Sequence, residues 1–423
     1  MEHAIAYSTL AITVGLAVSR PRIGLGELRV TPGIAAVLGV IVLLFTGLLH
    51  RDDLLTSARI QWRPLLALTC IMIMAGVVKE VGAFERMALW IEARARTVST
   101  SRAFNLIFLA GVLTPSLLNN DAAILLLTPV VVAVARRLYP GNHRVLEAFV
   151  FAVFLAPGVA PFIISNPMNM IVAEFGGLHF NSYAAVMAPI SVVGALLTFA
   201  ILRLRYRHVL TTSVPEPGPL HMPARHPAER PALGFLLVVF LSYPLMAAFD
   251  GPIWSVAVLG AIGCLAIARI YRVAPATKVA RHVSLDILAF LWGVFLVVAG
   301  LRSVGVIDSL AGFYHAYGTP ESVHLSVIGV TSAVGSAVVD NHPMSILNML
   351  ALTDHVGSRP LLAALIGGDI GPRLLPIGSL AGLLWMDLLR RRGIEIGLGK
   401  FIRIGTLVLI PTLAVSLLML IAM

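Results

Sequence analysis

Three aspartates stand in stretches of sequence that are otherwise apolar. Asp121 is the only charged residue between Arg102 and Arg136, Asp340 ends a long uncharged run, and Asp369 interrupts another. Burial disfavours the charged form of a carboxyl group, so a buried aspartate can bind and release protons near neutral pH. We therefore expect these carboxyl groups to face a polar cavity and at least one of them, Asp121 first, to carry a proton in the protein's function.

Asp121 belongs to a polar cluster at a predicted break between two helices. Asn119 and Asn120 precede it, and a Thr-Pro pair stands on each side, the second of them including Thr128. Proline removes a backbone donor and frees a carbonyl group, and a broken helix offers carbonyl groups to a cation and amides to an anion. The cluster is either a binding site to which Asn119, Asn120 and Thr128 contribute, or a polar loop at a membrane face.

A similar polar arrangement recurs later in the chain as Asp340-Asn341-His342-Pro343. This recurrence favours the binding site over the loop and adds Asn341 to the candidate ligands. His342 beside Asp340 could titrate near neutrality, although a plain hydrogen-bonding role is the commoner one for a lone histidine.

Ser165, Asn166 and Asn169 form a third polar cluster within the uncharged run Ala148–Ala173. Buried amide and hydroxyl groups need hydrogen-bond partners. They therefore either bind a substrate or satisfy a break in the helix, and the sequence favours neither.

The fourth cluster combines glycines and prolines with two charges. Asp369 and Arg373 lie in the stretch 367–373, and Ser379 follows in Pro-Ile-Gly-Ser. Irregular backbone at membrane depth must be buried in protein or line a cavity. Asp369 and Arg373 could form an ion pair, and a pair that breaks when the aspartate is protonated would be a coupling device.

Other chemistries find little support in the sequence. Cys70 and Cys264 both lie in apolar runs, which argues against a disulfide framework or a thiolate metal site. The chain has no phosphate-binding Gly-x-x-x-x-Gly-Lys-Ser/Thr loop and no His-Glu-x-x-His or Gly-x-Ser-x-Gly motif. We therefore expect no enzyme activity, no cofactor and no bound metal, and an intramembrane enzyme is the weakest of the alternatives.

The elements that position these residues must be membrane-spanning helices. The 423 residues are 58% hydrophobic and only 12% charged, whereas a soluble domain carries roughly 25% charged residues. A spanning helix needs about 20 mostly apolar residues. The sequence predicts an all-α polytopic membrane protein with about ten to twelve transmembrane segments, at the runs Ala4–Ser19, Val30–Leu49, Pro64–Val78, Ala103–Asn120, Ala122–Ala135, Ala148–Ala173, Phe175–Leu202, Pro231–Phe249, Gly251–Ala268, Ile287–Leu301, Ser322–Val339, Leu361–Met386 and Ile404–Met423.

The chain divides into two similar halves. The Pro- and Arg-rich stretch 203–230 is too polar to span a membrane, so we interpret it as a cytoplasmic linker between transmembrane repeats at 1–202 and 231–423. The sequence Lys79-Glu80-Val81-Gly82 aligns with Arg302-Ser303-Val304-Gly305, and 118–121 aligns with 338–341. Repeated halves are typical of secondary transporters. The net charge of +10 comes from arginines between the spans, as the positive-inside bias predicts, and does not indicate nucleic-acid binding.

The four clusters resemble motifs of one transporter family. The stretch 120–129, NDAAILLLTP, is similar to the Asn-Asp…Thr-Pro motif of ArsB-type arsenite efflux pumps, which belong to the ion transporter superfamily. Ser165-Asn166-Pro167-Met168-Asn169 is similar to that family's Ser-Asn-x-x-Asn, and the stretch 367–381 is similar to its most specific motif. The resemblance covers nearly the whole chain.

The resemblance implies a fold, an activity and partners. It implies paired inverted repeats with broken helical hairpins in the inner membrane, and export of arsenite and antimonite in exchange for protons. Asp121, Asp340, Asp369 and Arg373 are then the candidates for proton coupling. Members of the family can also partner a soluble arsenite-stimulated ATPase, and both such a partner and a homo-oligomeric assembly are compatible with the sequence.

Two departures from the family pattern concern the substrate more than the fold. Gly368 stands where the family carries cysteine, and Asp340-Asn341-His342-Pro343 stands where it carries two asparagines, an apolar residue and proline. The Asp-Asn pair is more similar to sodium/proton antiporters of the same superfamily, which remain the alternative. Trivalent arsenic prefers thiolate ligands, so in this chain arsenite would bind as the neutral hydroxide through amide, hydroxyl and backbone groups.

Overall fold

The computed structural model is built from helices and describes residues 2–21, 30–97, 99–213, 224–352 and 358–423. Among these residues, seven helices are long and apolar enough to cross a membrane. The other predicted spans fall on shorter helices and on helices that break partway. The predicted all-α polytopic fold is confirmed.

In the described residues, the first half of the chain holds nine α-helices and one short 3₁₀ turn. In order these elements are α1 (Glu2–Ser19), α2 (Pro32–Phe45), α3 (Arg51–Glu80), α4 (Ala83–Thr97), α5 (Thr100–Leu117), α6 (Asn120–Leu138), α7 (His143–Leu155), the 3₁₀ turn η1 (Ile163–Ser165), α8 (Pro167–Phe175) and α9 (Phe180–Arg205).

The second half repeats that order. Its elements are α10 (Glu229–Ala248), α11 (Ile253–Ile270), the short α12 (Ala276–Ala280), α13 (Leu285–Gly300) with η2 (Leu301–Val304), α14 (Val306–Ala316), α15 (Glu321–Val339), α16 (Asn341–Ala351), α17 (Arg359–Ile370), η3 (Gly371–Arg373), η4 (Pro376–Gly378), α18 (Leu380–Arg390) and α19 (Leu398–Ala422).

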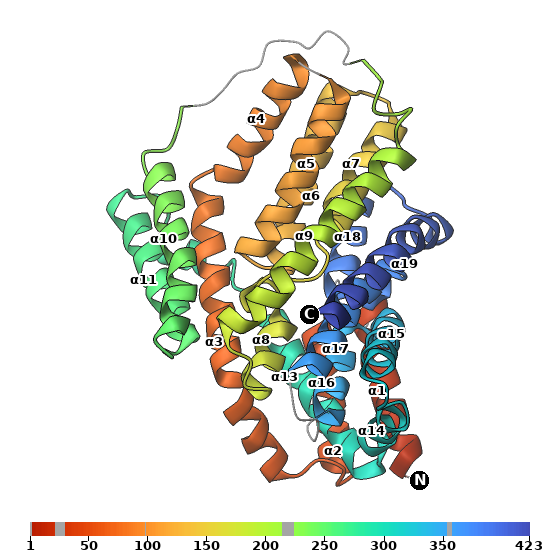
Figure 1. Cartoon of the computed structure of the whole chain (residues 1–423). Helices are drawn as coiled ribbons and strands as arrows, with labels where there is room; N and C mark the ends of the chain where they lie inside the picture. The colour runs from red at the N-terminus through yellow and green to blue at the C-terminus, as the bar shows by residue number, and fades with distance from the viewer. Residues whose placement is uncertain (1, 22–29, 98, 214–223, 353–357) are drawn as a thin grey trace.

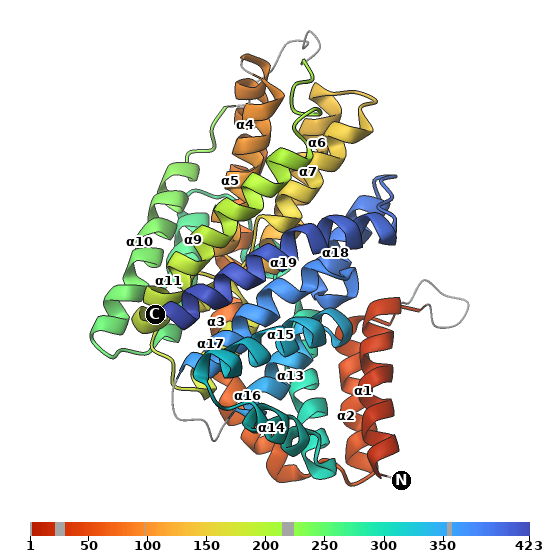
Figure 2. The ribbon, with the colours of Figure 1, turned by 45° about the vertical axis from the view of Figure 1, so that its right-hand side comes forward.

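Corresponding helices of the two halves also make corresponding contacts. The pairs α2–α13 and α11–α3 correspond, as do α5–α7 with α15–α17 and α18–α6 with α8–α16. Helices α8 and α18, which follow the long breaks, therefore each pack against the other half, while α9 and α19 pack on each other and run diagonally across the molecule (Figures 1 and 2). The pairs α1–α2 and α10–α11 lie on opposite sides of it (Figure 2).

Both sequence matches between the halves have a structural counterpart. Gly82 and Gly305 adopt left-handed φ values of 79° and 71°, and each makes the turn into the next helix of its half. Asn119 caps α6 and Asp340 caps α16. The structural correspondence at the second match is therefore shifted by one residue from the sequence alignment. The assignment of 1–202 and 231–423 as repeats stays a prediction, and residues 214–223 of the linker lie outside the described part of the chain.

Small residues allow the closest helix crossings. A side chain on Gly33 of α2 would meet the backbone and the carboxylate of Asp286 at 2.6 Å. That carboxylate accepts a hydrogen bond from the Gly33 N–H at 2.9 Å, so it fixes α2 against α13. The corresponding α3–α11 crossing is close at Gly260, whose added Cβ would lie 2.7 Å from the sulfur of Met74.

The arginine-rich segments gather at one end of the molecule. Glu147, at the start of α7, accepts hydrogen bonds from Tyr206 at the end of α9 and from Lys400 at the start of α19. Arg86 pairs with Glu229 at 2.6 Å, which brings the start of α4 to the start of α10.

Candidate functional site

The break between α7 and α8 carries the best-defined polar centre. Residues 156–166 leave the helix, turn through η1 and re-enter it at α8, where Asn166 is the N-cap. Asn166 Oδ1 accepts from the Met168 N–H at 3.1 Å. This cap leaves its amide Nδ2 free to point away from α8, because an N-cap side chain uses only its oxygen to hold the helix.

Asp369 of α17 receives three hydrogen bonds from this break. Asn166 Nδ2 donates to Oδ1 at 2.6 Å, while the Ala160 N–H and Asn169 Nδ2 donate to Oδ2 at 2.8 and 3.2 Å. Asn169 Nδ2 also lies 2.7 Å from the hydroxyl of Tyr183, which in turn donates to the Ala160 carbonyl at 2.9 Å. The carboxylate of one half is thus held by amides of the other. We name Asp369, Asn166, Asn169 and Tyr183 the amide centre.

Arg373 also crosses to the first half, but it does not hydrogen-bond to Asp369. Its guanidinium donates to the carbonyl groups of Leu155 and Pro157, both at 2.8 Å, and to Thr412 Oγ1 at 2.9 Å. The side chain is only 3% exposed. Arg373 therefore satisfies the carbonyl end of α7 that the break leaves open, a place where a cation is favourable. The ion pair that the sequence allowed for these two residues is not formed.

A small cavity lies beside the amide centre. Its volume is about 20 Å³, and its polar lining comes from both halves, at Ser116, Asn120, Ser165, Asn166, Ser191 and Asp369. A space of roughly 10–15 Å³ is enough for one water molecule, so in this conformation the cavity is nearly closed. Ser165 donates to the Ser116 carbonyl at 3.0 Å, which ties the break to α5.

A second polar centre joins the first turns of α6 and α16. His342 Nδ1 lies 2.6 Å from Asp340 Oδ1, and the His342 backbone N–H donates to the same oxygen at 2.9 Å. Asp121 stands two residues after the N-cap of α6, as His342 does in α16, and it is close enough to interact electrostatically with both His342 and Asp340. We name Asp121, Asp340 and His342 the acid–histidine cluster. Its side chains are 2–5% exposed.

Several buried polar atoms around the two centres have no hydrogen-bond partner in the described structure. The set comprises Asn119 Nδ2, Asn120 Oδ1, Asp121 Oδ2, Thr128 Oγ1, Asn169 Oδ1, Ser336 Oγ, Asn341 Oδ1 and His342 Nε2. Buried polar groups normally find a partner. A concentration of unpaired donors and acceptors at two helix breaks is therefore the signature of a site that binds a polar solute or water.

Some of the site residues predicted from the sequence line the cavity, and others cap helices or are buried elsewhere. Asn120, Ser165 and Asn166 line the cavity together with Asp369, and Asn169 lies beside them. Asn119 caps α6 through the Ala122 N–H at 2.7 Å. The side chain of Ser379 caps α18 through the Gly382 N–H at 3.0 Å, so it holds a helix end. Thr128, Asn341 and Asn119 are buried but are not part of the cavity lining.

Tyr183, Ser116 and Ser191 were not predicted from the sequence. Tyr183 is about 1% exposed and connects Asn169 to the backbone of the break. Ser116 directly follows the Thr114-Pro115 pair, which was the available signal for it, whereas Tyr183 and Ser191 lie along α9, outside the four polar clusters. Only the packing of α5 and α9 against the break brings them to the site.

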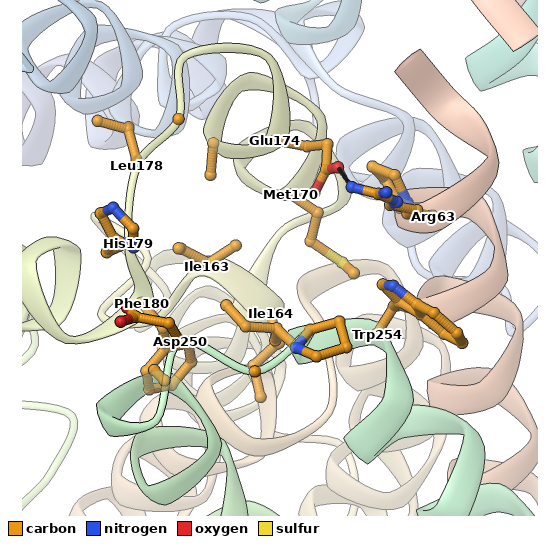
Figure 3. Close-up of a pocket in the computed structure, with 18 residues that line it drawn as sticks. Arg63, Ile163, Ile164, Met170, Glu174, Leu178, His179, Phe180, Asp250 and Trp254 are labelled. Carbon is orange, nitrogen blue, oxygen red and sulfur yellow. Dashed lines mark hydrogen bonds and ion pairs between the residues drawn. The ribbon is translucent and has the colours of Figure 1, made fainter. Parts of the chain in front are cut away.

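A larger cavity of about 320 Å³ is lined by α3, η1, α8 and the α10–α11 connection, which lies at the end of α10 away from the linker (Figure 3). Ile163 and Ile164 of η1 form its inner wall, and Arg63 and Glu174 form an ion pair at 2.8 Å across it. Asp250 and Trp254 of the α10–α11 connection complete the rim. Ser165, the residue after Ile164, lines the cavity of the amide centre. The segment η1 therefore separates that cavity from this outer cavity.

Comparison with known proteins identifies the family. A family model described as ArsB, arsenical pump membrane protein, matches residues 12–423. The chain is 29% identical to the arsenical pump membrane protein of Escherichia coli (strain K12) and 30% identical to that of Yersinia enterocolitica, over 98% of this chain and 97% of each relative.

One solved structure supports the same fold. The YdaH transporter of Alcanivorax borkumensis, described as having an unusual topology, aligns with a TM-score of 0.58 at 15% identity, over 99% of this chain and 96% of that one. The family resemblance predicted from the motifs is confirmed. The chain is a multi-pass membrane protein and belongs to the arsenical pump membrane protein (ArsB) family of transporters.

Proposed function

We propose that this chain is a secondary transporter that exports arsenite and antimonite from the cytoplasm across the inner membrane in exchange for protons. The observation that carries the proposal is the amide centre with its cavity. It lies at a helix break, is shared by the two halves, and is buried between an arginine-rich end and an outer cavity. Sites at the interface of repeats, formed by broken helices, are typical of secondary transporters.

The ligands available at the site suit a neutral hydroxide. The cavity offers the amides of Asn120 and Asn166 and the hydroxyls of Ser116, Ser165 and Ser191. Both cysteines are buried outside this lining, in α3 and α11. Hydrogen bonds to a trihydroxide would release their cargo more easily than bonds to thiolates, and a transporter must release what it binds. Asn119, Thr128, Asn169 and Asn341 supply further ligands when the breaks rearrange.

The proposed direction follows from the charge asymmetry. The arginine-rich end faces the cytoplasm by the positive-inside rule. The outer cavity then lies on the extracytoplasmic side, with η1 as the wall that must move for release (Figure 3). Protons moving inward through Asp121, Asp340 or Asp369 would drive the export, with Arg373 keeping the end of α7 in place.

A sodium/proton antiporter is the second candidate. The observation in its favour is that Asp121 and Asp340, one carboxylate from each half, lie within electrostatic range of each other at two helix breaks. A soluble ATPase partner and a homo-oligomeric assembly are compatible with either function.

Growth of two sensitive hosts separates the candidates. Expression should restore growth of an arsenite-sensitive strain on arsenite and leave a sodium-sensitive strain unable to grow at high sodium. The matched control is the Asp369→Asn protein at equal membrane abundance. It keeps the shape of the site but cannot accept all three hydrogen bonds, so it should restore neither. Sodium tolerance without arsenite resistance would reject the first proposal in favour of the second.

A further inference from the structure

The acid–histidine cluster combines two carboxylates and one imidazole where water does not reach. Asp121, Asp340 and His342 are 5%, 4% and 2% exposed. Unpaired buried charges are strongly unfavourable, so two buried carboxylates that interact with each other are stabilised by a proton within the cluster. The cluster has a net charge of −2 when the imidazole is neutral, and a proton on His342 reduces it to −1.

The geometry of His342 fixes which nitrogen is available for that proton. Nδ1 lies 2.6 Å from the Asp340 carboxylate, which only accepts hydrogen bonds, so Nδ1 carries a hydrogen in the neutral ring. Nε2 then holds the lone pair, and it has no hydrogen-bond partner in the described structure. Phe290 packs edge-on against the ring with centroids 5.4 Å apart and holds its plane.

The backbone supports the same arrangement. Asp340 adopts φ 78° and ψ 146°, a conformation that side chains rarely take. Strained residues of this kind occur where the surrounding structure fixes them, often at functional sites. The two hydrogen bonds from His342 to a single carboxylate oxygen hold Asp340 there.

Two carboxylates are the charged groups that act on His342. Helix α16 packs against α8, α13, α14, α15 and α17. The titratable residues of these helices, other than Asp340 at the end of α15, are Glu174, Asp286, Asp308, Tyr314, His315, Glu321, His324, Arg359 and Asp369. In the described part of the chain, the groups that interact electrostatically with the imidazole are Asp340 and Asp121.

Asp369 is less suited to take up the proton. Both of its oxygens already accept hydrogen bonds from fixed donors, one of them a backbone N–H that cannot turn away. A proton on Oδ2 would have to displace one of its two bonds, and Oδ1 has a single lone pair left. Asp121 Oδ2 and His342 Nε2, by contrast, have no partner.

We propose that the coupled proton binds at His342 Nε2, on the ring whose Nδ1 is held by Asp340 of its own half and with which Asp121 of the other half interacts electrostatically. This inference rests on the proposed proton-coupled transport. It goes beyond that proposal because it separates the proton site from the amide centre that binds the substrate. Protonation changes the electrostatic interaction of His342 at the start of α16 with Asp121 at the start of α6, and these helices belong to different halves. Binding of a proton can therefore favour one packing of the halves over another.

The proton site can be tested without any transport substrate. Purified full-length protein with ¹⁵N-labelled histidine should show one imidazole that is lost in the His342→Gln variant, with hydrogen on Nδ1 in its neutral form. That signal should titrate, and Asp340→Asn and Asp121→Asn should each displace its midpoint by about one pH unit or more. His324→Gln, which changes another buried histidine on α15, is the matched control and should leave the signal in place. A His342 signal that does not titrate between about pH 5 and pH 9 would overturn the proposal.

Transport then tests the role of the proton. In everted vesicles, a pH gradient should raise arsenite uptake by the wild type and the His324→Gln protein, while uptake by His342→Gln stays at its level without a gradient. Downhill exchange of arsenite should survive in His342→Gln, which shows that the variant is folded. Gradient-driven uptake by His342→Gln equal to wild type would reject the inference. Failure of the wild type to move arsenite or antimonite would reject the proposed function instead, and the titration would still decide the proton site.

Discussion

At the scale of single residues, the buried aspartates differ in how many hydrogen bonds their carboxylate oxygens accept. Asp369 accepts three hydrogen bonds from the opposite half. Asp121 has an oxygen without a partner in the described structure and is the more deeply buried of the two, at 5% exposure. Equal residue types in similar apolar runs thus have different surroundings, because both oxygens of Asp369 accept hydrogen bonds and one oxygen of Asp121 accepts none in the described structure.

The first prediction concerns Asp121→Asn. The amide keeps the size of the side chain and removes the carboxylate that acts on His342, so uptake into everted vesicles should no longer respond to a pH gradient. Downhill exchange should continue, because the cavity and the three hydrogen bonds to Asp369 are unchanged. Uptake measured with and without the gradient checks this, with Asn105→Asp, an amide–carboxylate exchange on the surface of α5, as a control of similar size.

Two outcomes would contradict that prediction. If the Asp121→Asn protein responds to the gradient as strongly as wild type, Asp121 takes no part in coupling and attention moves to Asp340. If it loses downhill exchange as well, at normal membrane abundance, Asp121 belongs to the substrate site instead.

At the scale of elements, the breaks in the helices are held open by contacts from the other half. Arg373 occupies the carbonyl end of α7, and its own backbone carbonyl lies against Gly405 of α19. A glycine is required at position 405 because a Cβ there would overlap this carbonyl oxygen. The rigid α19 thereby sets the position of Arg373, and Arg373 sets the geometry of the break.

The second prediction compares two glycines of α19. Gly405→Ala should lower the thermal stability of the purified protein and reduce transport, since overpacking a tight contact costs about 1–3 kcal/mol. Gly399→Ala in the same helix has no atom within 4 Å of the added Cβ. It should be neutral or stabilising by up to about 1 kcal/mol, because alanine favours the helix.

The unfolding midpoints of the two variants in detergent provide the measurement. A Gly405→Ala protein as stable as the Gly399→Ala protein would show that Arg373 and its turn can move aside, and that α19 does not fix the break.

At the scale of the whole molecule, the two halves have the same element order and corresponding contacts. We expect them to superpose by a two-fold rotation about an axis in the membrane plane. Helix α9 has 26 residues and extends about 39 Å, which is enough to connect the arginine-rich end to the outer cavity. The orientation of those two ends in the membrane is open to direct measurement.

The third prediction places one position on each side of the membrane. Thr211 follows α9 at the arginine-rich end, and Ser322 begins α15 beside Glu321, which pairs with Arg359 at 2.8 Å. Arg359 in turn reaches the carbonyl of Leu420 at the far end of α19. In a chain whose cysteines are replaced by alanine, Ser322→Cys should react with a membrane-impermeant thiol reagent added to whole cells.

Thr211→Cys should react only in everted vesicles. Both side chains are exposed at the surface of the described structure, so neither should be protected by burial. Labelling of both positions from the same side would contradict the proposed orientation and, with it, the direction of transport.

The sequence by itself determined the class of the protein and the location of its polar clusters. Scarce charge and long apolar runs fix a polytopic helical fold, because a bilayer accepts only structures that satisfy their own backbone. Asp121, Asp340 and Asp369 were recognisable for the same reason, since charge at membrane depth is costly and rare. The matched glycines 82 and 305 were visible because a left-handed turn needs glycine.

Only the tertiary structure decided how these clusters are used. Asn166 and Asp369 are far apart in the sequence, and only the fold brings Asn166 Nδ2 to 2.6 Å from Asp369 Oδ1. Asp369 and Arg373 are close in the sequence, which suggested an ion pair, but Arg373 binds Thr412 and backbone carbonyl groups instead. The sequence also could not show that the side chain of His342 hydrogen-bonds to Asp340, or that Ser379 caps a helix. Hydrogen-bond partners depend on which broken helix faces which, and that is set by the packing of one half on the other.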